Sequence, residues 1–306
     1  MNNLEIHIEN YLDYCSLQKR LDKKTLKAYQ IDLRQFTTNN SLQDISDLTV
    51  ANLEQYIASL HQKYKPKTVK RKIASLKALF RYLEYKDLIA ANPFNKMQIK
   101  FREPVILPKT IPLNTVENLL STMYRYHENT KTAFQSKKNL RDIAVIELLF
   151  ATGMRISELC SLKMSDVNLY DRTILINGKG AKERRIQIGS NEVANILQEY
   201  RRSFADEIQN CDHFFANLNG TPLSDQAVRR MINKYVSLAS IELHITPHMF
   251  RHTFATSLLE ADVDIRYIQE MLGHSSINIT EIYTHVAMSK QRDILTTKHP
   301  RKDFNI

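Results

Sequence analysis

The sequence predicts a mainly α-helical protein of two domains, the second of which contains a small β-sheet. Apolar residues recur at helical spacing along most of the chain, and two short β-branched runs flank one glycine-containing turn. A polar stretch with several prolines separates two groups of helices. The chain has 306 residues, of which 43% are apolar, and this is enough for two cores of ordinary size.

The first domain is predicted to be a bundle of four or five helices over residues 1–98. Four segments carry apolar residues at helical spacing, namely residues 3–20, 24–37, 50–63 and 67–85. The stripe of the last segment consists of Val69, Ile73, Leu76, Phe80 and Leu83. Lysines and arginines lie opposite this stripe, so the bundle is expected to have one basic face.

A linker is predicted at residues 99–112. Asn92-Pro93 ends the helical pattern, because a proline disfavours helical backbone in the residue before it. The stretch from Lys100 to Pro112 contains three prolines and is polar and extended in character. The second domain therefore spans residues 113–306.

The second domain is predicted to be helical except for one hairpin. Residues 173–176 and 185–188 are β-branched runs on either side of a turn at residues 177–182. Helical patterns are expected at residues 114–123, 140–151, 190–205, 224–239, 247–260, 264–272 and 276–286. The polar run from Tyr124 to Asn139 is expected to be an exposed loop.

The charge of the chain points to a polyanionic partner. The net charge is +10, and residues 1–100 hold 17 Lys or Arg against 10 Asp or Glu. No carboxylate occurs between Glu54 and Glu84. The basic candidates for contacts to DNA in this interval are Lys65, Lys67, Lys70, Arg71, Lys72, Lys77 and Arg81. Charge alone does not separate DNA from RNA or an acidic protein, and a solvated helix face is the plainer alternative.

Several classes of protein are disfavoured. No apolar run is long enough to span a membrane, and the first residues lack the layout of a secretion signal, so a cytoplasmic protein is expected. The three cysteines, Cys15, Cys160 and Cys211, are far apart and form no Cys-x-x-Cys pair. Reduced thiols are therefore expected, with neither a disulfide framework nor a cysteine zinc site.

Four short segments of the second domain stand out. They are residues 152–159 (TGMRISEL), Gly178-Lys179-Gly180, the run from His248 to His252 (HMFRH), and Leu272-Gly273-His274 followed nine positions later by Tyr283. In order and spacing they resemble the tyrosine recombinase family, particularly the Xer recombinases and the simpler phage-type integrases. This resemblance implies a core-binding, SAM-like helical domain that clasps DNA, a linker, and a mostly helical catalytic domain.

Arg155 and Arg251 are suited to bind one phosphate. Breaking a phosphodiester requires stabilisation of charge on its non-bridging oxygens, and a planar guanidinium donates two parallel hydrogen bonds to such a group. For Arg155 alone, an ion pair with Glu158 three residues later is the plainer alternative.

His248 lies three residues before Arg251 on one predicted helix, so both side chains share a face. His274 follows Gly273 at a predicted helix end. His252 lies four residues after His248 and invites a zinc interpretation, but no glutamate or third ligand completes that pattern, and no metal is expected. The resemblance implies that His248 assists proton transfer from the nucleophile and that His274 binds the phosphate.

The resemblance further implies that Lys179 protonates the leaving 5′ oxygen, with Lys182 in the same turn as the alternative or as a contact to DNA. Tyr283 would be the nucleophile. A phenol with an ordinary pKa near 10 needs cationic neighbours and a proton acceptor to attack at neutral pH. Tyr267 is the nearby tyrosine with which it could be confused, and the spacing from His274 distinguishes them.

The implied reaction is a transesterification through a 3′-phosphotyrosyl link that needs neither ATP nor metal, so no cofactor is expected. Exchange of both strand pairs implies a Holliday junction and four protomers, identical or of two kinds, on two double-stranded DNA sites, associated with the nucleoid. We expect residues 287–306 to dock on a neighbouring protomer.

Finer assignments remain open between a Xer-like enzyme and a mobile-element integrase. The chain begins with the core-binding helices, which favours the first, whereas the long polar loop expected at residues 124–139 favours the second. The alternatives are DNA relaxation of the type IB topoisomerase kind and a DNA-binding regulator without activity.

Overall fold

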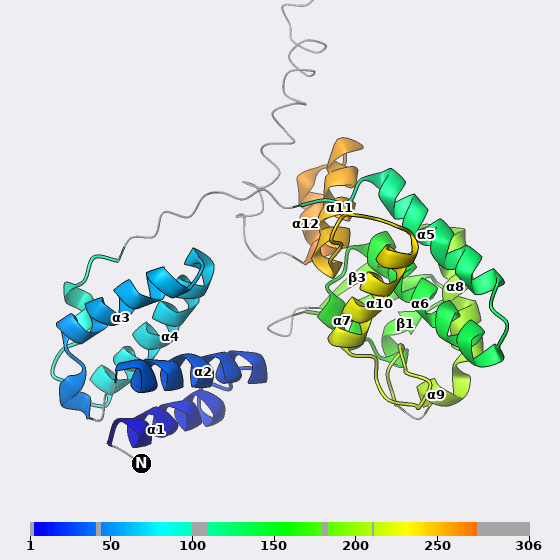
Figure 1. Cartoon of the computed structure of the whole chain (residues 1–306). Helices are drawn as coiled ribbons and strands as arrows, with labels where there is room; N and C mark the ends of the chain where they lie inside the picture. The colour runs from blue at the N-terminus through cyan, green and yellow to red at the C-terminus, as the bar shows by residue number, and fades with distance from the viewer. Residues whose placement is uncertain (1–2, 41–43, 100–108, 179–182, 210, 274–306) are drawn as a thin grey trace, which may run out of the picture. The chain divides into compact units, whose positions relative to one another are not determined.

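The computed structural model describes residues 3–40, 44–99, 109–178, 183–209 and 211–273. The chain divides into two compact units, Met1–Ile106 and Leu107–Ile306 (Figure 1). Each unit has its own apolar core. The mainly helical class predicted from the sequence is confirmed. None of the helices described is long and apolar enough to cross a membrane.

The first unit is a helical bundle with one buried core. Its described helices are α1 (Asn3–Leu17), α2 (Lys23–Asn40), α3 (Val50–Lys63) and α4 (Pro66–Tyr85), with 3-10 turns at Ile45–Asp47 and Pro93–Lys96. The Thr49 side chain accepts a hydrogen bond from the backbone N–H of Asn52 and so begins α3, while Pro66 occupies the first turn of α4. The five apolar residues of the predicted stripe on α4 are all buried.

Lys72 does not lie on the basic face of α4, and that part of the prediction is wrong. Its side chain is 3% exposed, and its ammonium lies 3.0 Å from a carboxylate oxygen of Asp32 on α2. The ammonium also donates to Gln35. Lys72 follows Val69 by three residues and precedes Leu76 by four, which is the spacing of the buried stripe.

Asp32 organises this buried polar cluster. Its carboxylate accepts hydrogen bonds from Arg71, Lys72 and Ser75, all on α4, and its side chain is fully buried. Two helices are therefore joined through one carboxylate.

Replacing Asp32 with alanine should destabilise the first unit by about 3 kcal/mol, because a buried ammonium would lose its charged partner. The measurement is denaturant unfolding of the purified chain. The exposed Asp13 on α1 offers the matched control, and Asp13→Ala should change the free energy of unfolding by less than about 0.5 kcal/mol. Equal unfolding midpoints for the two variants would contradict a stabilising role of the Asp32 cluster.

The second unit contains helices on both sides of the central helix α6. Its described helices are α5 (Leu113–Glu128), α6 (Ala133–Thr152), α7 (Ile156–Cys160), α8 (Asn191–Ser203), α9 (Ala205–Gln209), α10 (Asp225–Leu238), α11 (Pro247–Glu260) and α12 (Ile265–Leu272). Helix α6 is buried along most of its length and contacts α5, α8 and α11.

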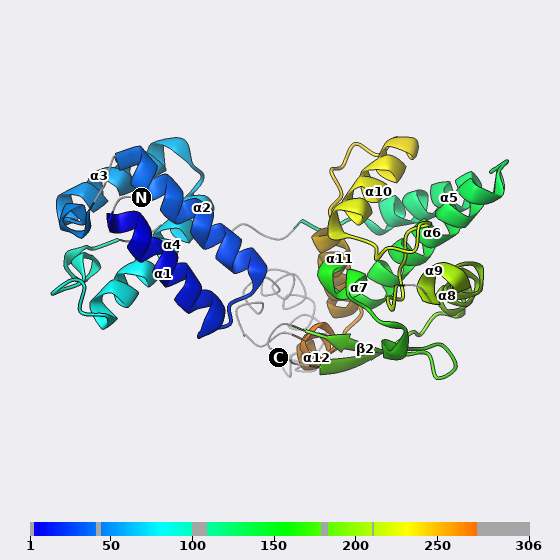
Figure 2. The same ribbon diagram turned by 90° about the horizontal axis from the view of Figure 1, so that it is seen from below.

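A small antiparallel sheet lies beside the helices of the second unit. Its strands are β1 (Val167–Asn168), β2 (Thr173–Asn177) and β3 (Glu183–Gln187), in the order β1-β2-β3. Ile174 pairs with Ile186, so both apolar side chains enter the core. Helix α12 contacts β3, and Figure 2 shows this helix beside the sheet. The predicted hairpin is confirmed, whereas β1, α7 and α9 were not predicted.

The loop expected at residues 124–139 is not present, and this prediction is wrong. Helix α5 continues to Glu128 and α6 begins at Ala133, so only residues 129–132 connect them. The Thr132 side chain accepts a hydrogen bond from the backbone N–H of Gln135 and begins α6. Asn139 is polar but fully buried, and hydrogen bonds to Gln135 and Thr130 satisfy its amide. Residues 124–138 are exposed or half-buried, so the error lies in taking a polar stretch for a loop.

Candidate active site

Arg155 lies where α6 ends and α7 begins. Gly153 ends α6 in the left-handed conformation, with a φ of 58°, and a Cβ built there would lie 2.6 Å from the ring of Phe254. Two residues later, the Arg155 side chain is 35% exposed, and its Nη1 lies 2.7 Å from Oε1 of Glu158. The ion pair considered as the plainer alternative is therefore formed. The Arg155 side chain is therefore partly accessible from solvent.

Arg251 links its own motif to two of the other three sequence motifs. It lies in the second turn of α11, which spans Pro247–Glu260 as predicted and has Pro247 in its first turn. The residue is 5% exposed. Its Nη1 donates to the carbonyl oxygen of Gly153 at 2.9 Å, and its Nη2 donates to that of Leu272 at 2.6 Å. The guanidinium thus holds the loop before Arg155 against the end of α12.

Helix α12 ends at Gly273, as predicted. Gly273 has a φ of 64°, and its N–H bonds back to the carbonyls of Gln269 and Glu270. The carbonyls of the last turn have no partner within a helix. Arg184 and Arg251 donate to those of Met271 and Leu272, respectively. Two guanidiniums at the negative end of a helix dipole are favourable by charge as well as by hydrogen bonding.

Arg184 is a residue that the sequence analysis missed. It lies on β3, and its side chain is 9% exposed. Its guanidinium donates to both carboxylate oxygens of Glu158, at 3.1 and 2.7 Å. Strand alternation could have revealed it, because Arg184 shares a strand face with the buried Ile186. The predicted strand began at residue 185, two residues after the start of β3.

Glu158 is surrounded by donors from two arginines. Burial alone would raise the pKa of its carboxyl, but hydrogen bonds from Arg184 and from Arg155 outweigh burial and lower this pKa to about 2. The carboxylate is therefore ionised at every pH at which the protein is expected to work. It holds Arg155 on one side and Arg184 on the other.

Glu158→Gln should lower the free energy of unfolding by about 3 kcal/mol at pH 7. Because the folded-state pKa lies below the ordinary one, the stabilisation is complete above about pH 4.5 and is lost as the pH falls towards 2. The difference between variant and wild type should therefore shrink over that interval. Denaturant unfolding at several pH values measures it, with the exposed Glu199→Gln as control. A constant difference across that range would contradict the linkage.

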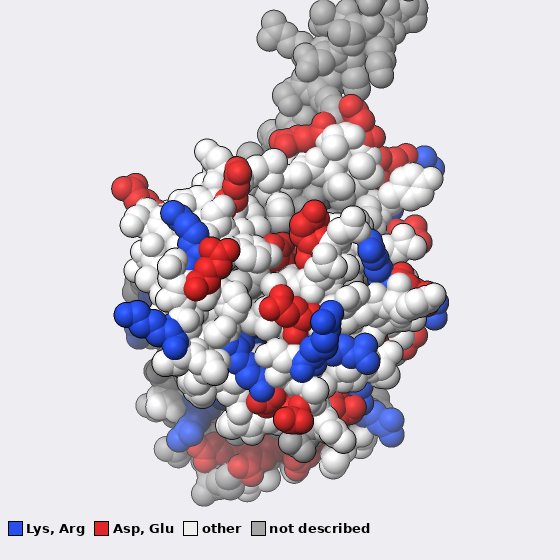
Figure 3. All heavy atoms as spheres, turned by 90° about the vertical axis from the view of Figure 1, so that its right-hand side faces the viewer, with Lys and Arg blue, Asp and Glu red and all other residues white. Residues whose placement is uncertain are grey.

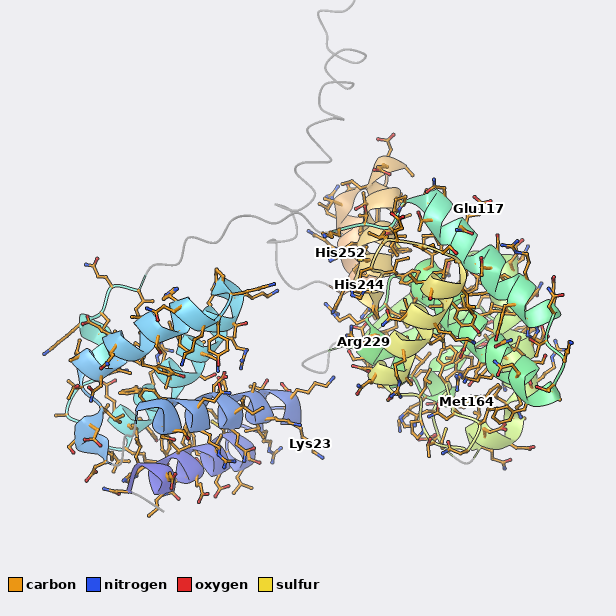
Figure 4. The ribbon with its side chains drawn as sticks, viewed as in Figure 1. Lys23, Glu117, Met164, Arg229, His244 and His252 are labelled. Atoms are coloured by element: carbon orange, nitrogen blue, oxygen red, sulfur yellow. The ribbon has the colours of Figure 1, made fainter. Side chains whose placement is uncertain are left out.

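The two histidines of α11 differ in exposure. His248 is exposed, whereas His252, which is labelled in Figure 4, is half-buried. Burial, together with the nearby His248 and Arg251, lowers the pKa of His252, which favours its neutral form. Within the described ranges, no group of three or more His, Cys, Asp or Glu side chains is arranged to hold a metal ion.

Several predicted site residues lie outside the described ranges: Lys179, Lys182, His274 and Tyr283. The same applies to the helix expected at residues 276–286 and to residues 287–306. Among the described residues, Arg251 connects the Arg155 motif to Leu272 at the end of α12. Leu272 and Gly273 directly precede His274 in the sequence.

The basic residues of α4 belong to the first unit. Those that are exposed are Lys67, Lys70, Arg71 and Arg81, and Lys65 at the N-cap of the helix is exposed as well. Lys77 is half-buried, with its ammonium 5.7 Å from the centre of the Phe94 ring. With the exception of Lys72, the predicted residues therefore face solvent at least in part.

Surfaces elsewhere in the second unit lack the motif residues. An open pocket of 590 Å³ between α6 and α10 is lined by residues such as Lys138, Arg230 and Lys234, and by none of the four motifs. On the face drawn in Figure 3, lysines and arginines are interspersed with acidic side chains. That face therefore lacks the continuous positive charge that would attract a polyanion.

Comparison with known proteins defines the class. Residues 111–290 match the phage integrase family, and residues 8–86 match the N-terminal SAM-like domain of phage integrases. The chain therefore belongs to the phage integrase family of tyrosine recombinases. It is 67% identical to a tyrosine recombinase of Agathobacter rectalis, with both chains covered completely. It is also 34% identical to the tyrosine recombinase XerC of Oceanobacillus iheyensis, over 100% of this chain and 99% of the relative.

Solved structures share the fold. A XerH site-specific recombinase bound to its palindromic difH substrate in a post-cleavage complex matches 95% of this chain and 84% of its own, with a TM-score of 0.71 and 21% identity. A lambda integrase tetramer bound to a Holliday junction matches 90% of this chain and 78% of its own, with a TM-score of 0.66 and 19% identity.

Proposed function

We propose that this chain is a site-specific DNA recombinase that cuts and rejoins DNA through a 3′-phosphotyrosyl bond to Tyr283. The observation that carries the proposal is the pair of hydrogen bonds from Arg251 to the carbonyls of Gly153 and Leu272. They bring the Arg155 motif, the Arg251 motif and the end of α12 to one place. A phosphate at this place would meet two guanidiniums.

In the proposed reaction, the phenol oxygen of Tyr283 attacks the scissile phosphorus, and the bond to the 5′ oxygen breaks. Arg155 and Arg251 stabilise the charge on the non-bridging oxygens, and His274 donates a further hydrogen bond to them. His248, which is exposed on the helix of Arg251, accepts the phenol proton. Lys179, or Lys182 in the same turn, protonates the leaving 5′ oxygen.

Rejoining reverses these steps with a 5′ hydroxyl from a partner strand. The phosphotyrosyl bond retains the energy of the broken phosphodiester, so the cycle requires neither ATP nor metal. Exchange of two strand pairs through a Holliday junction uses four tyrosines. We therefore propose a tetramer, of one or two kinds of protomer, on two double-stranded sites, as in the lambda integrase tetramer with which the chain shares its fold.

The first unit supplies a second contact to DNA in this proposal. Its exposed basic residues on α4 would neutralise backbone phosphates, while Lys72 serves only the interior. Binding to chromosomal DNA would place the protein in the cytoplasm with the nucleoid.

A Xer-like role is favoured over mobile-element integration. The identity to XerC extends over the whole chain, and the long loop expected at residues 124–139, the feature that had favoured an integrase, is helical instead. Both roles use the same chemistry and differ in the DNA sites that are joined.

The test is to trap the protein on a recombination site with a nick beside the scissile phosphate. The short fragment that carries the freed 5′ hydroxyl then diffuses away, and rejoining stops. A covalent protein–DNA adduct that survives denaturation and maps by mass spectrometry to Tyr283 is expected. An adduct on another residue would reject the assignment of the nucleophile. Relaxation of supercoiled DNA without exchange between two sites would favour the topoisomerase alternative, and site binding with no adduct would favour the regulator.

A further inference from the structure

Arg184 connects three parts of the second unit. Its side chain extends from β3 and is 9% exposed. The Nε atom donates to the carbonyl oxygen of Met271 at 2.8 Å, and the two terminal nitrogens donate to the two carboxylate oxygens of Glu158. One planar group is therefore fixed by three hydrogen bonds to two different elements, which leaves it little rotational freedom.

The first connection leads to Arg155. Oε1 of Glu158 accepts from Arg155 at 2.7 Å and from Arg184 at 3.1 Å. Oε2 accepts from the backbone N–H of Arg155 at 2.8 Å and from Arg184 at 2.7 Å. Because the carboxylate is shared, the position of the Arg155 side chain depends on where Arg184 holds Glu158. A displaced Arg184 would move the guanidinium that is expected to meet the phosphate.

The second connection leads to the end of α12. A Cβ built on Gly273 would lie 3.0 Å from both Cδ and Nη1 of Arg184, so the arginine packs directly against the glycine backbone. The positive φ of Gly273 favours glycine, and a Cβ at this position would force the Arg184 side chain to shift by a few tenths of an ångström. Arg184 thereby fixes the last residue before His274 in the sequence.

We propose that Arg184 is a positioning residue. It holds Arg155 in place through Glu158, and it holds the end of α12 in place directly. This inference rests on the proposed function. Each of the three nitrogens of the Arg184 guanidinium donates to a protein acceptor, which suits a supporting role, whereas Arg155 is 35% exposed and available to a ligand. A lysine in place of Arg184 would retain the charge, but one ammonium lacks the planar fork that spans a carboxylate and a carbonyl together.

The test is single-turnover formation of the covalent adduct on nicked site DNA, with the protein in saturating excess. Arg184→Lys should slow adduct formation by about 10- to 100-fold, the usual effect of moving a supporting group, while site binding changes less than about threefold. Arg185→Lys is the matched control, because Arg185 is the next residue on β3 and is exposed. It should form the adduct at the wild-type rate. Should Arg184→Lys fail to fold, Arg184→Gln takes its place.

A combined substitution separates positioning from general damage. If Arg184 acts through Arg155, adding Arg184→Lys to Arg155→Lys should slow the reaction less than the product of the two single effects. Fully multiplicative effects, or a wild-type rate for Arg184→Lys, would overturn the inference. Failure of the wild-type chain to form any adduct would instead reject the proposed function.

Discussion

Tyr283→Phe should abolish adduct formation, with a loss of at least about 10⁴-fold, because it removes the one oxygen that would attack the phosphorus. Binding to the recombination site should remain within about twofold of wild type, since a single hydroxyl contributes little to an affinity made by many phosphate contacts. The measurement pairs a gel assay for the covalent complex with a binding titration at fixed salt. The expected result is full occupancy of the site without cleavage.

The control for this variant is Tyr267→Phe. Tyr267 lies on α12, is 64% exposed, and is the tyrosine nearest in sequence to the predicted nucleophile among those described. Its hydroxyl should be dispensable. Cleavage that persists in Tyr283→Phe and disappears in Tyr267→Phe would move the nucleophile to α12. Biological function that persists in Tyr283→Phe without any cleavage would identify a DNA-binding regulator.

Helices with a strong apolar stripe could be predicted from the sequence. Helix α4 was placed within one residue at its start, because its stripe, Pro66 and the following turn agree with one another. The end of α12 at Gly273 was predictable for the same reason, since glycine adopts positive φ without strain. Local signals sufficed wherever they pointed to one answer.

The errors occurred where a polar residue serves the interior. Lys72 and Asn139 are buried, and the Arg184 side chain is largely buried, because each meets a partner from a distant part of the sequence. Polarity suggests exposure for such residues, and only the fold shows that Asp32 or Glu158 is near enough to offset the loss of water. Burial of these residues could be suspected from strand or helix periodicity, but their partners could not be named.

In the candidate site, too, residue types could be predicted from the sequence but their partners could not. The residue types and spacings of the four motifs identified Arg155 and Arg251, whereas the role of Arg251 as a cap for α12 was not visible in the sequence. A carbonyl at a helix end has no sequence signature, so the donor that satisfies it appears only in the folded chain. Half of the described network, namely Glu158 and Arg184, lay outside the predicted catalytic set.

Arg251→Ala should therefore have two effects with different origins. In the absence of DNA, the carbonyls of Gly153 and Leu272 would lose a buried donor each, and the free energy of unfolding should fall by about 3 kcal/mol. On nicked site DNA, adduct formation should slow by about 10³-fold, because a charged donor to the phosphate is removed. Arg201→Ala, an exposed arginine on α8, should leave the stability within about 0.5 kcal/mol of wild type.

The two effects can be separated by temperature. Stability is measured by denaturant unfolding, and cleavage is measured well below the midpoint of thermal unfolding, where nearly all of the variant is folded. If Arg251 only supports the fold, the folded variant should cleave at nearly the wild-type rate under these conditions. If it also binds the phosphate, the slow rate should persist in the fully folded protein. A neutral methylphosphonate at the scissile position should then reduce the difference between variant and wild type, because less charge needs stabilisation. An undiminished difference would show that Arg251 affects the rate by positioning neighbouring groups and not by binding the phosphate.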